Sequence, residues 1–428
     1  MFNVNRRGFL KLTTAATLPV FGVPSIARGA SQKVVVIGGG PGGATAAKYL
    51  KMASPQLNVT LIEASAEYIA CFLSNEALIG RRTMDSLTVR FDGLKQHGIN
   101  IVLDTVTGLD PASKRVSTRE GKTYAYDRCV VAPGIDFRWD AIEGYNEMTS
   151  ATIPHAWKAG AQTQLLRKQI ESMKDGGTVI IVAPPNPFRC PPGPYERASL
   201  LAHYFKSHGK TKSKIIILDP KDDFIKKELF IQAWSRMYGY GTPDSMIQWI
   251  AGADGGKVDK IDPKTLMVQA QIDDFKADVL NVIPPQKAGA IAAAAGLTDR
   301  NGWCLVNQKT FESTLHTGVY VIGDSCVAGI MPKSAYSANS QAKVAASAII
   351  ASLEGREPET PSYVNTCYSI AGHDYGFSVA AVYTFDDDKQ VITGKSAITA
   401  SDASPEMLKR EVAYAHSWFN NIVADSWQ

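Results

Sequence analysis

Short runs of aliphatic, mostly β-branched residues recur along the chain, and several are followed by segments of helical composition. The first run, residues 33–37, leads into five glycines and one proline and then into a helical stretch at 44–50. Such runs are typical of parallel strands buried on both faces. The pattern therefore predicts an α/β fold built from two Rossmann-like dinucleotide-binding domains. Further runs lie at residues 59–62, 128–131, 178–182, 214–218 and 319–322.

The first predicted strand ends at a loop with the spacing of a dinucleotide-binding motif. Gly38, Gly40 and Gly43 stand where glycine permits a tight turn, close approach of the backbone to a pyrophosphate and close helix packing. The amides at the start of the next helix would face the phosphates. Glu63 ends the second strand, where its carboxylate can accept the hydroxyls of an adenosine ribose. This motif alone leaves both FAD and NAD open.

Two distant segments favour FAD. Residues 126–134 read as a strand that enters a tight turn containing Ala132 and Gly134, and residues 318–324 read as a strand that ends in Gly323 and Asp324. In flavoproteins with two dinucleotide folds, an acid at that place binds the ribityl or pyrophosphate region, although an isolated Asp can simply cap a helix. The three segments in this order predict an FAD-binding domain that is split by an insertion.

The insertion begins a second strand–loop–helix pattern, but its loop differs in kind from the first. The strand at 178–182 leads into residues 183–194, which contain six prolines. Proline lacks an amide hydrogen, and its ring obstructs the approach of a phosphate. Because the next strand at 214–218 is retained, we predict an NAD-like fold without a nicotinamide site, which argues against an NAD(P)H oxidoreductase.

Cys190 lies within this proline-rich loop, next to Arg189 and shortly before Glu196 at the start of a predicted helix. We expect an extended backbone at Cys190. A neighbouring cation and a helix N-terminus lower the pKa of a thiol and favour the thiolate. A cysteine can also pack as a small apolar residue, but this position at the mouth of a dinucleotide fold favours a redox role.

Length and composition limit the class of protein. The chain has 428 residues, of which 45% are apolar and 20% are charged, and this excludes collagen-like, coiled-coil and low-complexity classes. Two or three domains are expected at this length. Six cysteines are too few for a disulfide scaffold, and there is no C-x-x-C-H motif by which the chain itself would attach a c-type haem. No residues are assigned to a metal.

The net charge of +4 is concentrated at the N-terminus. Residues 1–30 hold four cations and no acid, so the remainder has 41 basic and 41 acidic residues. Arg6 and Arg7, followed by Phe-Leu-Lys and a weakly apolar run, are typical of a twin-arginine signal that exports folded, cofactor-loaded proteins to the periplasm. The balanced remainder gives no support for nucleic-acid binding. No later stretch has the length and apolarity of a membrane-spanning helix.

Four further segments carry a family resemblance. They are residues 70–75 (Ala-Cys-Phe-Leu-Ser-Asn), the proline-rich loop around Cys190, residues 331–339 and residues 361–368. With them, the chain from about residue 33 onward resembles the flavoprotein subunit of flavocytochrome c sulfide dehydrogenase, in the disulfide-oxidoreductase flavoprotein superfamily. The resemblance implies FAD held covalently through Cys71, a redox-active disulfide between Cys190 and Cys367, and a separate subunit that carries haem c.

The resemblance also implies roles for other residues. The helical region predicted at 337–353, which follows the segment 332–336 with Lys333, Ser334 and Ala335, would direct its N-terminal amides at the flavin, where a helix dipole stabilises negative charge. Lys333 would add positive charge there or extend into solvent. Trp418 would lie close to the flavin ring, and Glu196 would move a proton at the disulfide. Three cysteines are expected to have no redox role: Cys129, Cys304 and Cys326.

The predicted organisation follows from the motifs and the resemblance. Residues 1–30 are the signal, 31–145 and 286–357 the FAD-binding domain, 146–285 the NAD-like domain, and 358–428 a C-terminal α+β domain facing a cytochrome. In the mechanism that the resemblance implies, hydrosulfide opens the disulfide and electrons pass through FAD to the partner's haem. The sulfur leaves as zero-valent sulfur or polysulfide.

Two other functions remain open at this stage. A sulfide:quinone oxidoreductase would need a quinone site and an amphipathic C-terminus that grips a membrane, whereas residues 404–428 carry mixed charges better suited to a protein interface. A flavin-binding accessory protein of a sulfur-oxidation pathway would bind FAD without reacting with sulfide.

Overall fold

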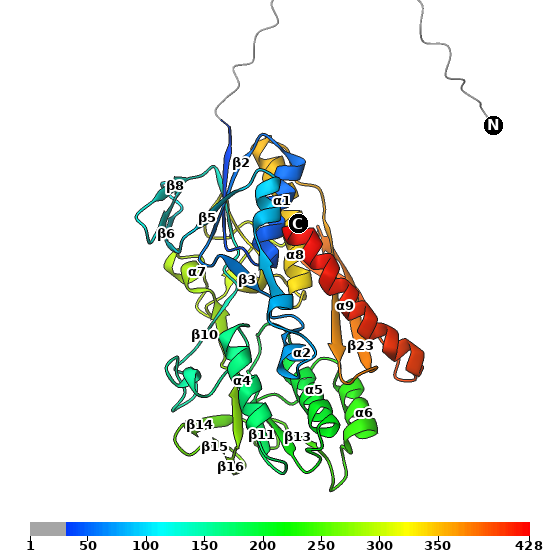
Figure 1. Cartoon of the computed structure of the whole chain (residues 1–428). Coiled ribbons are helices and arrows are strands. Elements are labelled where there is room, and N and C mark those ends of the chain that lie inside the picture. The colour runs from blue at the N-terminus through cyan, green and yellow to red at the C-terminus, as the bar shows by residue number, and fades with distance from the viewer. Residues whose placement is uncertain (1–30) are drawn as a thin grey trace, which may run out of the picture. The chain divides into compact units, whose positions relative to one another are not determined.

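Two parallel sheets form from the apolar runs (Figure 1). The larger consists of β1 (Lys33–Ile37), β2 (Asn58–Glu63), β5 (Asn100–Leu103), β9 (Arg128–Val131) and β20 (Val319–Val321), in the order β20-β9-β1-β2-β5. The smaller consists of β11 (Thr178–Val182), β12 (Lys214–Leu218), β13 (Ile247–Ile250) and β17 (Val279–Val282), in the order β13-β12-β11-β17. Because β20 follows the smaller sheet in sequence and joins the larger one, the first fold is interrupted by the second.

The computed structural model describes residues 31–428, so the predicted twin-arginine signal lies outside the described residues. Within residues 31–428, helices alternate with strands along the chain. The helices are α1 (Pro41–Ala53), α2 (Ser74–Leu78), α3 (Asp92–Gln96), α4 (Ala161–Ser172), α5 (Gly193–Ser207), α6 (Lys227–Tyr238), α7 (Ala290–Ala294), α8 (Ala335–Leu353) and α9 (Pro405–Trp427), with 3₁₀ turns η1 (Asp85–Leu87), η2 (Thr149–Ala151) and η3 (Gly323–Ser325). No helix within 31–428 combines the length and hydropathy needed to cross a bilayer.

Two of these helices start earlier than the sequence pattern predicts. α1 begins at Pro41 rather than at residue 44, because proline is well suited to the first helical position, where its missing N–H has no partner to lose. α8 begins at Ala335, since the Ser334 hydroxyl accepts a hydrogen bond from the Ser337 amide at 3.0 Å and caps the helix. Both starts bring helix N-termini to the ends of parallel strands.

Short antiparallel elements complete the two folds. Strands β10 (Ile135–Phe137) and β18 (Gln286–Ala288) pair where the chain leaves and re-enters the first fold. The remaining elements are β3 (Glu67–Ile69) with β4 (Thr88–Arg90), β6 (Val106–Asp110) with β7 (Arg115–Thr118) and β8 (Thr123–Ala125), β14 (Val258–Asp262) with β15 (Met267–Ala270) and β16 (Asp274–Lys276), and β19 (Cys304–Leu305) with β21 (Cys326–Val327).

The C-terminal part is an antiparallel sheet with one long helix. Strands β22 (Ser362–Ile370), β23 (Gly376–Asp386) and β24 (Val391–Ile398) pair in sequence order. Helix α9 packs against this sheet and against α1, and it ends beside α1 in Figure 1. The Thr45 and Ser426 hydroxyls lie 2.8 Å apart at that contact. The predicted fold class, two Rossmann-like folds and a C-terminal α+β part, is confirmed, while the domain boundaries stay predictions.

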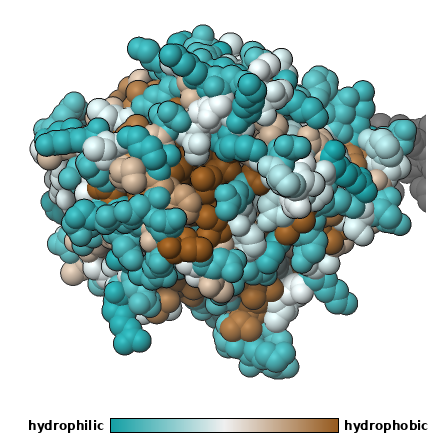
Figure 2. Space-filling view, turned by 90° about the horizontal axis from the view of Figure 1, so that it is seen from below, coloured by the Kyte–Doolittle hydropathy of each residue, from teal (hydrophilic) through white to brown (hydrophobic). Residues whose placement is uncertain are grey.

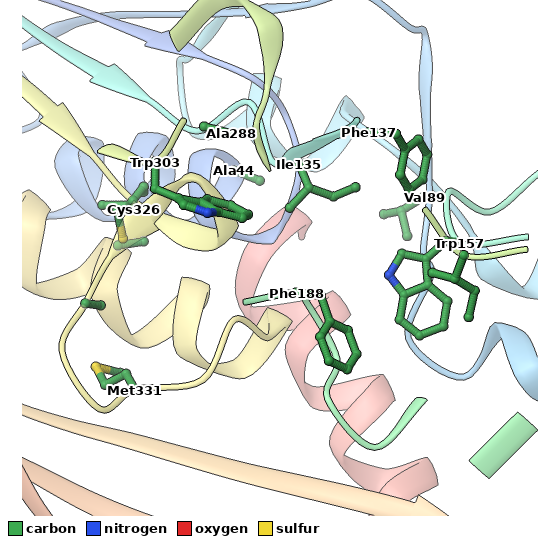
Figure 3. Packing of buried hydrophobic residues seen from close by; sticks show 14 of the residues in the cluster. Ala44, Val89, Ile135, Phe137, Trp157, Phe188, Ala288, Trp303, Cys326 and Met331 are labelled. Atoms are coloured by element: carbon green, nitrogen blue, oxygen red, sulfur yellow. The ribbon is translucent and has the colours of Figure 1, made fainter. Parts of the chain in front are cut away.

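Apolar residues from both folds meet between the sheets. Figure 3 shows Phe188 and Trp157 beside Ile135 and Phe137, and all four belong to the largest buried cluster. Phe188 follows the first strand of the second fold, whereas Ile135 and Phe137 lie in β10. Seen from below, the surface is mainly hydrophilic around a recessed apolar area (Figure 2).

Candidate active site

The glycine-rich loop after β1 has no room for a side chain at Gly38 or Gly43. Gly38 has φ +96°, and a Cβ there would lie 2.4 Å from the carbonyl oxygen of Ala132, in the turn after β9. A Cβ on Gly43 would lie 1.9 Å from the Gly38 carbonyl oxygen. Glu63, at the end of β2, accepts a hydrogen bond from the Gly39 amide at 2.6 Å. The loop therefore brings bare backbone and the expected carboxylate together, as a dinucleotide site requires.

The other expected FAD ligands converge on the same region. Gly134 has φ +69°, and its carbonyl accepts a hydrogen bond from Ser325 in the Gly323–Ser325 turn. Asp324 in that turn is partly buried, and its Oδ1 atom is fully enclosed without a hydrogen-bond partner among the described residues. Burial raises the pKa of Asp324, and the nearby Arg189 and Lys333 oppose that rise. A buried carboxylate oxygen without a donor fits the hydroxyl groups of FAD, which can donate a hydrogen bond to it.

Lys333 does not extend into solvent. Its ammonium donates hydrogen bonds to the carbonyls of Asp324 (2.8 Å) and Cys326 (2.7 Å) and lies 3.9 Å from the Trp303 ring centroid. Burial lowers the pKa of Lys333, although neighbouring anionic groups oppose that effect. The Lys333 carbonyl accepts a hydrogen bond from the Cys190 amide at 2.9 Å. This residue therefore joins the Asp324 turn, the start of α8 and the cysteine loop.

Cys71 lies in the turn between β3 and α2, and it is partly exposed. Its carbonyl accepts a hydrogen bond from the Ser74 hydroxyl at 2.6 Å, which holds the turn. The Cys71 sulfur contributes to the raised pKa of both Tyr68 and Arg189. Arg189 also lies 3.9 Å from an Asp324 carboxylate oxygen. Arg189 is thus a cationic neighbour of both Cys71, the predicted flavin tether, and Asp324, a predicted FAD-binding residue.

The segments that carry Cys190 and Cys367 pack together in the fold, because α5 contacts β22, although 177 residues separate the two cysteines in sequence. Cys190 precedes α5 and Cys367 lies within β22, and the charge of the Cys367 sulfur contributes to the raised pKa of Cys190. Both are free thiols in the structure, so the predicted disulfide stays a prediction.

Two expectations for Cys190 are wrong. Its φ of +53° is left-handed rather than extended, because the loop turns sharply into α5. Its pKa is raised well above the usual value rather than lowered, since burial disfavours the thiolate by more than the charge of Arg189 favours it. The pKa of Cys367 is also raised by burial, although Lys226 lowers it in part.

Glu196 lies in the first turn of α5, beside this cysteine pair. One carboxylate oxygen accepts a hydrogen bond from the Asn75 side chain at 2.9 Å, and the other accepts one from the Ile370 amide at 2.9 Å. Burial raises the pKa of Glu196, whereas these hydrogen bonds and the charge of Lys226 lower it. A carboxyl group with a raised pKa, next to two sulfurs, can exchange a proton with them.

Buried cations surround the cysteines. The Arg197 guanidinium, with the residue 2% exposed, donates to the side-chain oxygens of Asn75 (3.1 Å) and Asn281 (2.7 Å) and to the Ala156 carbonyl (2.6 Å). Lys226 is 4% exposed and donates to the Cys367 carbonyl at 2.7 Å. The Arg189 guanidinium donates to the Trp157 carbonyl. These positive charges offset part of the effect of burial, which disfavours the two thiolates.

The second fold also has an acid after its second strand, in the position that corresponds to Glu63, and this acid is fully enclosed. Asp219, directly after β12, accepts hydrogen bonds from Tyr195 (2.5 Å), Trp249 (3.1 Å) and Lys221 (2.6 Å). The Tyr195 ring stacks on Phe224 with centroids 3.6 Å apart. Side chains of the second fold thus donate to the carboxylate that a nicotinamide dinucleotide would otherwise contact.

Trp418 of α9 belongs to an aromatic cluster. Its ring lies 5.4 Å from Phe72, next to Cys71, and 5.9 Å from the parallel Tyr336 ring in the first turn of α8. Tyr368 of β22 is 6.3 Å away. The cluster connects the Cys71 turn with the C-terminal sheet, and Trp418 itself is partly exposed.

Sequence reasoning missed several residues of this site. Lys226 follows two acids and precedes a second lysine, so its sequence context resembles a solvated charged stretch. Asn75 lies in the 70–75 segment that carries part of the family resemblance, but its sequence context does not show its role. Trp427 donates to the Gly39 carbonyl at 3.0 Å and stacks on Tyr68, so the end of α9 contacts the glycine-rich loop, a contact for which the sequence held no signal.

Comparisons with known proteins cover most of the chain. Residues 32–172 match the family Pyridine nucleotide-disulphide oxidoreductase. Residues 163–284 match the central part of the Sulfide dehydrogenase (flavocytochrome c) flavoprotein chain. Residues 359–427 match the flavin-binding part of Flavocytochrome c sulphide dehydrogenase. Together these matches place a flavin in this chain, and the residues described above fit FAD.

Individual relatives agree with these matches. The mitochondrial sulfide:quinone oxidoreductase of Mus musculus is 23% identical over 398 residues, covering 84% of this chain and 82% of that protein. The solved structure of the sulfide:quinone oxidoreductase from Aquifex aeolicus is 19% identical, covers 92% of each chain, has a TM-score of 0.67 and shows the fold. The sulfide dehydrogenase (flavocytochrome c) flavoprotein chain of Chlorobaculum thiosulfatiphilum is 47% identical over 45 residues, which are 10% of this chain and 94% of that sequence. The chain therefore belongs to the family of flavocytochrome c sulfide dehydrogenase flavoprotein chains, in the pyridine nucleotide-disulphide oxidoreductase superfamily.

Proposed function

We propose that this flavoprotein oxidises sulfide at a redox pair formed by Cys190 and Cys367 and passes the electrons through FAD to a separate c-type cytochrome. The observation that carries the proposal is the convergence of these two sulfurs with Glu196 and buried cations. The family matches over residues 163–284 and 359–427 support the same chemistry.

The residues of the site have distinct tasks in this reaction. Hydrosulfide attacks one sulfur of the oxidised pair, the S–S bond breaks, and one cysteine keeps the new sulfur as a persulfide while the other leaves as a thiolate. Glu196, with its raised pKa, takes up the proton released as the persulfide is oxidised. Arg189 and Arg197 favour the approach of an anion. When bound, FAD supplies an acceptor that takes two electrons and releases them singly.

The first test is sulfide-dependent reduction of horse-heart cytochrome c by the purified full chain, with and without its Cys190→Ser variant. We expect reduction that needs both sulfide and Cys190. If Cys190→Ser reduces cytochrome c at the rate of the unaltered protein, the redox-pair mechanism is wrong. Bleaching of the flavin absorption by sulfide alone excludes a purely accessory role.

A quinone is the competing acceptor, because curated relatives that match over most of the chain are sulfide:quinone oxidoreductases. The flavin-binding match over 359–427 and the flavocytochrome c relative support a cytochrome. Assays with decylubiquinone and with cytochrome c, run side by side, decide the question. A higher rate with decylubiquinone would assign the chain to the quinone-dependent class.

We also propose that FAD is attached through Cys71. The position of Cys71 next to Tyr68 and within the influence of Arg189 supports this proposal. A mass spectrum of the unfolded protein tests it: we expect the mass of the chain plus FAD, and the chain mass alone for Cys71→Ser. A flavin that separates on unfolding of the unaltered protein contradicts the tether.

The periplasm is the proposed location, reached by twin-arginine export. The proposal rests on Arg6 and Arg7. Replacing both by lysine should retain the protein in the cytoplasm, and cell fractionation measures this. Equal periplasmic amounts of both forms would contradict it.

A further inference from the structure

The end of helix α9 lies against the glycine-rich loop that follows β1. The Trp427 indole N–H donates a hydrogen bond to the Gly39 carbonyl at 3.0 Å, and the Trp427 ring stacks on Tyr68 with centroids 5.2 Å apart. Trp427 is 1% exposed, so this hydrogen bond is shielded from water. Two residues that are 388 positions apart in sequence therefore meet at the loop where the FAD pyrophosphate is expected.

Contacts with three other helices hold the end of α9 in this place. The Ser426 hydroxyl lies 2.8 Å from the Thr45 hydroxyl of α1, and it accepts a hydrogen bond from the Asn339 side chain of α8 at 3.3 Å. A Cβ on Gly93 in α3 would lie 2.2 Å from the Trp427 carbonyl oxygen, so the helix end packs directly against α3. The position of the indole is therefore determined by α1, α3 and α8.

The indole hydrogen bond orients the peptide group between Gly39 and Gly40. In a trans peptide the carbonyl and the N–H point in opposite directions, so the Gly40 amide points away from the Trp427 indole. Rotation of this peptide group would take Gly40 from its φ of −67° to a positive φ, which glycine adopts as readily as a negative one. The glycines alone therefore permit either orientation, and the indole selects one of them.

The orientation matters because few amides of this loop are available to an anion. The Gly39 amide already donates to the Glu63 carboxylate at 2.6 Å, and Pro41 has no amide hydrogen. The Gly40 amide, directly before α1, has no hydrogen-bond partner within residues 31–428. An unpaired amide at a helix N-terminus binds phosphate oxygens, whereas a carbonyl oxygen turned to the same place would repel them.

We propose that Trp427 is a positioning residue for FAD, which holds the peptide group between Gly39 and Gly40 so that the Gly40 amide faces the pyrophosphate. Without the indole N–H, the peptide group is free to rotate, and the affinity for FAD falls although the fold is retained. The inference goes beyond the proposed function: it needs bound FAD, but neither the sulfide reaction nor the tether at Cys71.

Trp427→Phe tests the proposal, because it removes the N–H and retains an aromatic ring on Tyr68. The full chain carries Cys71→Ser in every sample so that the flavin can leave, and the Kd of FAD is measured by ultrafiltration of the loaded protein at a series of dilutions. We expect a Kd about tenfold higher, as the loss of one buried hydrogen bond predicts. Trp234→Phe is the matched control, because Trp234 is also buried and its indole donates to Ser199 at 2.7 Å in the second fold.

Amide hydrogen exchange of the FAD-loaded protein separates positioning from a general loss of stability. We expect residues 38–43 to exchange several-fold faster in Trp427→Phe than in the parent, with no change in Trp234→Phe. A purely structural role would instead speed exchange over α1 and the end of α9 together, and would leave the loop no faster than these helices. That result overturns the proposal.

The Kd of FAD gives two further outcomes that overturn the proposal. One is an unchanged Kd in folded Trp427→Phe protein, and the other is an equal rise in Trp234→Phe. If Trp427→Phe does not fold, benzothienylalanine in place of Trp427 keeps the shape of the ring and replaces the N–H by sulfur, and an unchanged Kd there overturns the proposal as well. None of these measurements uses sulfide or a cytochrome, so the proposed function and the role of Trp427 can fail independently.

Discussion

The two dinucleotide folds of this protein share their framework and differ at the ends of their first two strands. After β1, the loop is glycine-rich and α1 has no acid in its first turn; Glu63, at the end of the second strand, accepts hydrogen bonds from the Gly39 and Ser65 amides. After β11, the loop is proline-rich and α5 carries Glu196 in its first turn; Asp219, after the second strand, accepts hydrogen bonds from Tyr195, Trp249 and Lys221. In the proposed function, the same strand–helix geometry serves a cofactor in one fold and one cysteine of the redox pair in the other. Function lies in the loops rather than in the framework.

This comparison also explains where the cysteine pair lies. The helix N-terminus that would bind a phosphate in the second fold is next to a carboxylate and a thiol instead. A carboxylate there repels a phosphate but can serve a sulfur reaction. In the proposed function, the loss of a nucleotide site and the gain of a redox site are therefore the same structural change.

The largest effect should come from the proposed redox pair, Cys190 in the second fold and Cys367 in the C-terminal sheet. We expect Cys190→Ser and Cys367→Ser each to lower sulfide-dependent cytochrome c reduction at least about a thousandfold, because the reacting sulfur itself is removed. Steady-state rates measure this. Cys304→Ala, in a buried strand away from the pair, is the control and should retain most activity.

A second effect, on the pH profile, concerns Glu196. Because its pKa is raised, Glu196 is protonated over more of the acidic range, and as a proton acceptor it works only when ionised. We expect the rate of the unaltered protein to fall as the pH drops through the pKa of Glu196. In Glu196→Gln, the pH profile should lose this acidic limb, and the maximal rate should be roughly a hundredfold lower. The pH dependence of kcat is the measurement. A limb that persists in the variant assigns it to another group.

Two glycines provide a matched stability test of the two folds. Gly38 and Gly176 have φ of +96° and +88°, but only Gly38 has a neighbouring backbone atom in the way of a Cβ. Gly176→Ala should cost about 1–2 kcal/mol of unfolding free energy from its backbone conformation alone. Gly38→Ala should cost about 3 kcal/mol or more and reduce the flavin content. Denaturant unfolding and the flavin-to-protein absorbance ratio measure both. Equal costs would mean that the first loop has no special need for glycine.

The smallest effect concerns the enclosed acid of the second fold. Asp219→Asn should lower the free energy of unfolding by about 1–3 kcal/mol, because a buried charge-assisted network is weakened. Flavin content and sulfide activity should be unchanged, and NADH titration should show no binding in either protein. Binding of NADH to the unaltered chain would mean that the second fold also has a nucleotide site, and would contradict the comparison.

Much of the framework could be predicted because it depends on local pattern. The apolar runs at 33–37 and 178–182 form β1 and β11 within their expected bounds, since parallel strands are buried along their whole length. Glu63 ends β2, as expected, whereas β20 ends at Val321 and Asp324 follows it in the Gly323–Ser325 turn. Cys129 is a buried packing residue, as expected.

The chemistry of the site was less accessible to local reasoning. The pKa of Cys190 was predicted in the wrong direction, because a sequence shows the neighbouring Arg189 but not the burial that outweighs it. The expected extended backbone at Cys190 was wrong for a related reason, since the sharp turn depends on packing against Trp157 and the start of α8.

Residues adjacent in the chain are enough to predict the two strand–loop–helix frameworks, the glycine-rich and proline-rich loops, and the family resemblance. Which distant groups share one electrostatic environment depends on the tertiary structure. It brings Lys226 to the backbone of Cys367, encloses Asp219 and leaves the Oδ1 atom of Asp324 without a hydrogen-bond donor among residues 31–428. Burial and charge act through space, so their effects depend on contacts between residues far apart in the chain.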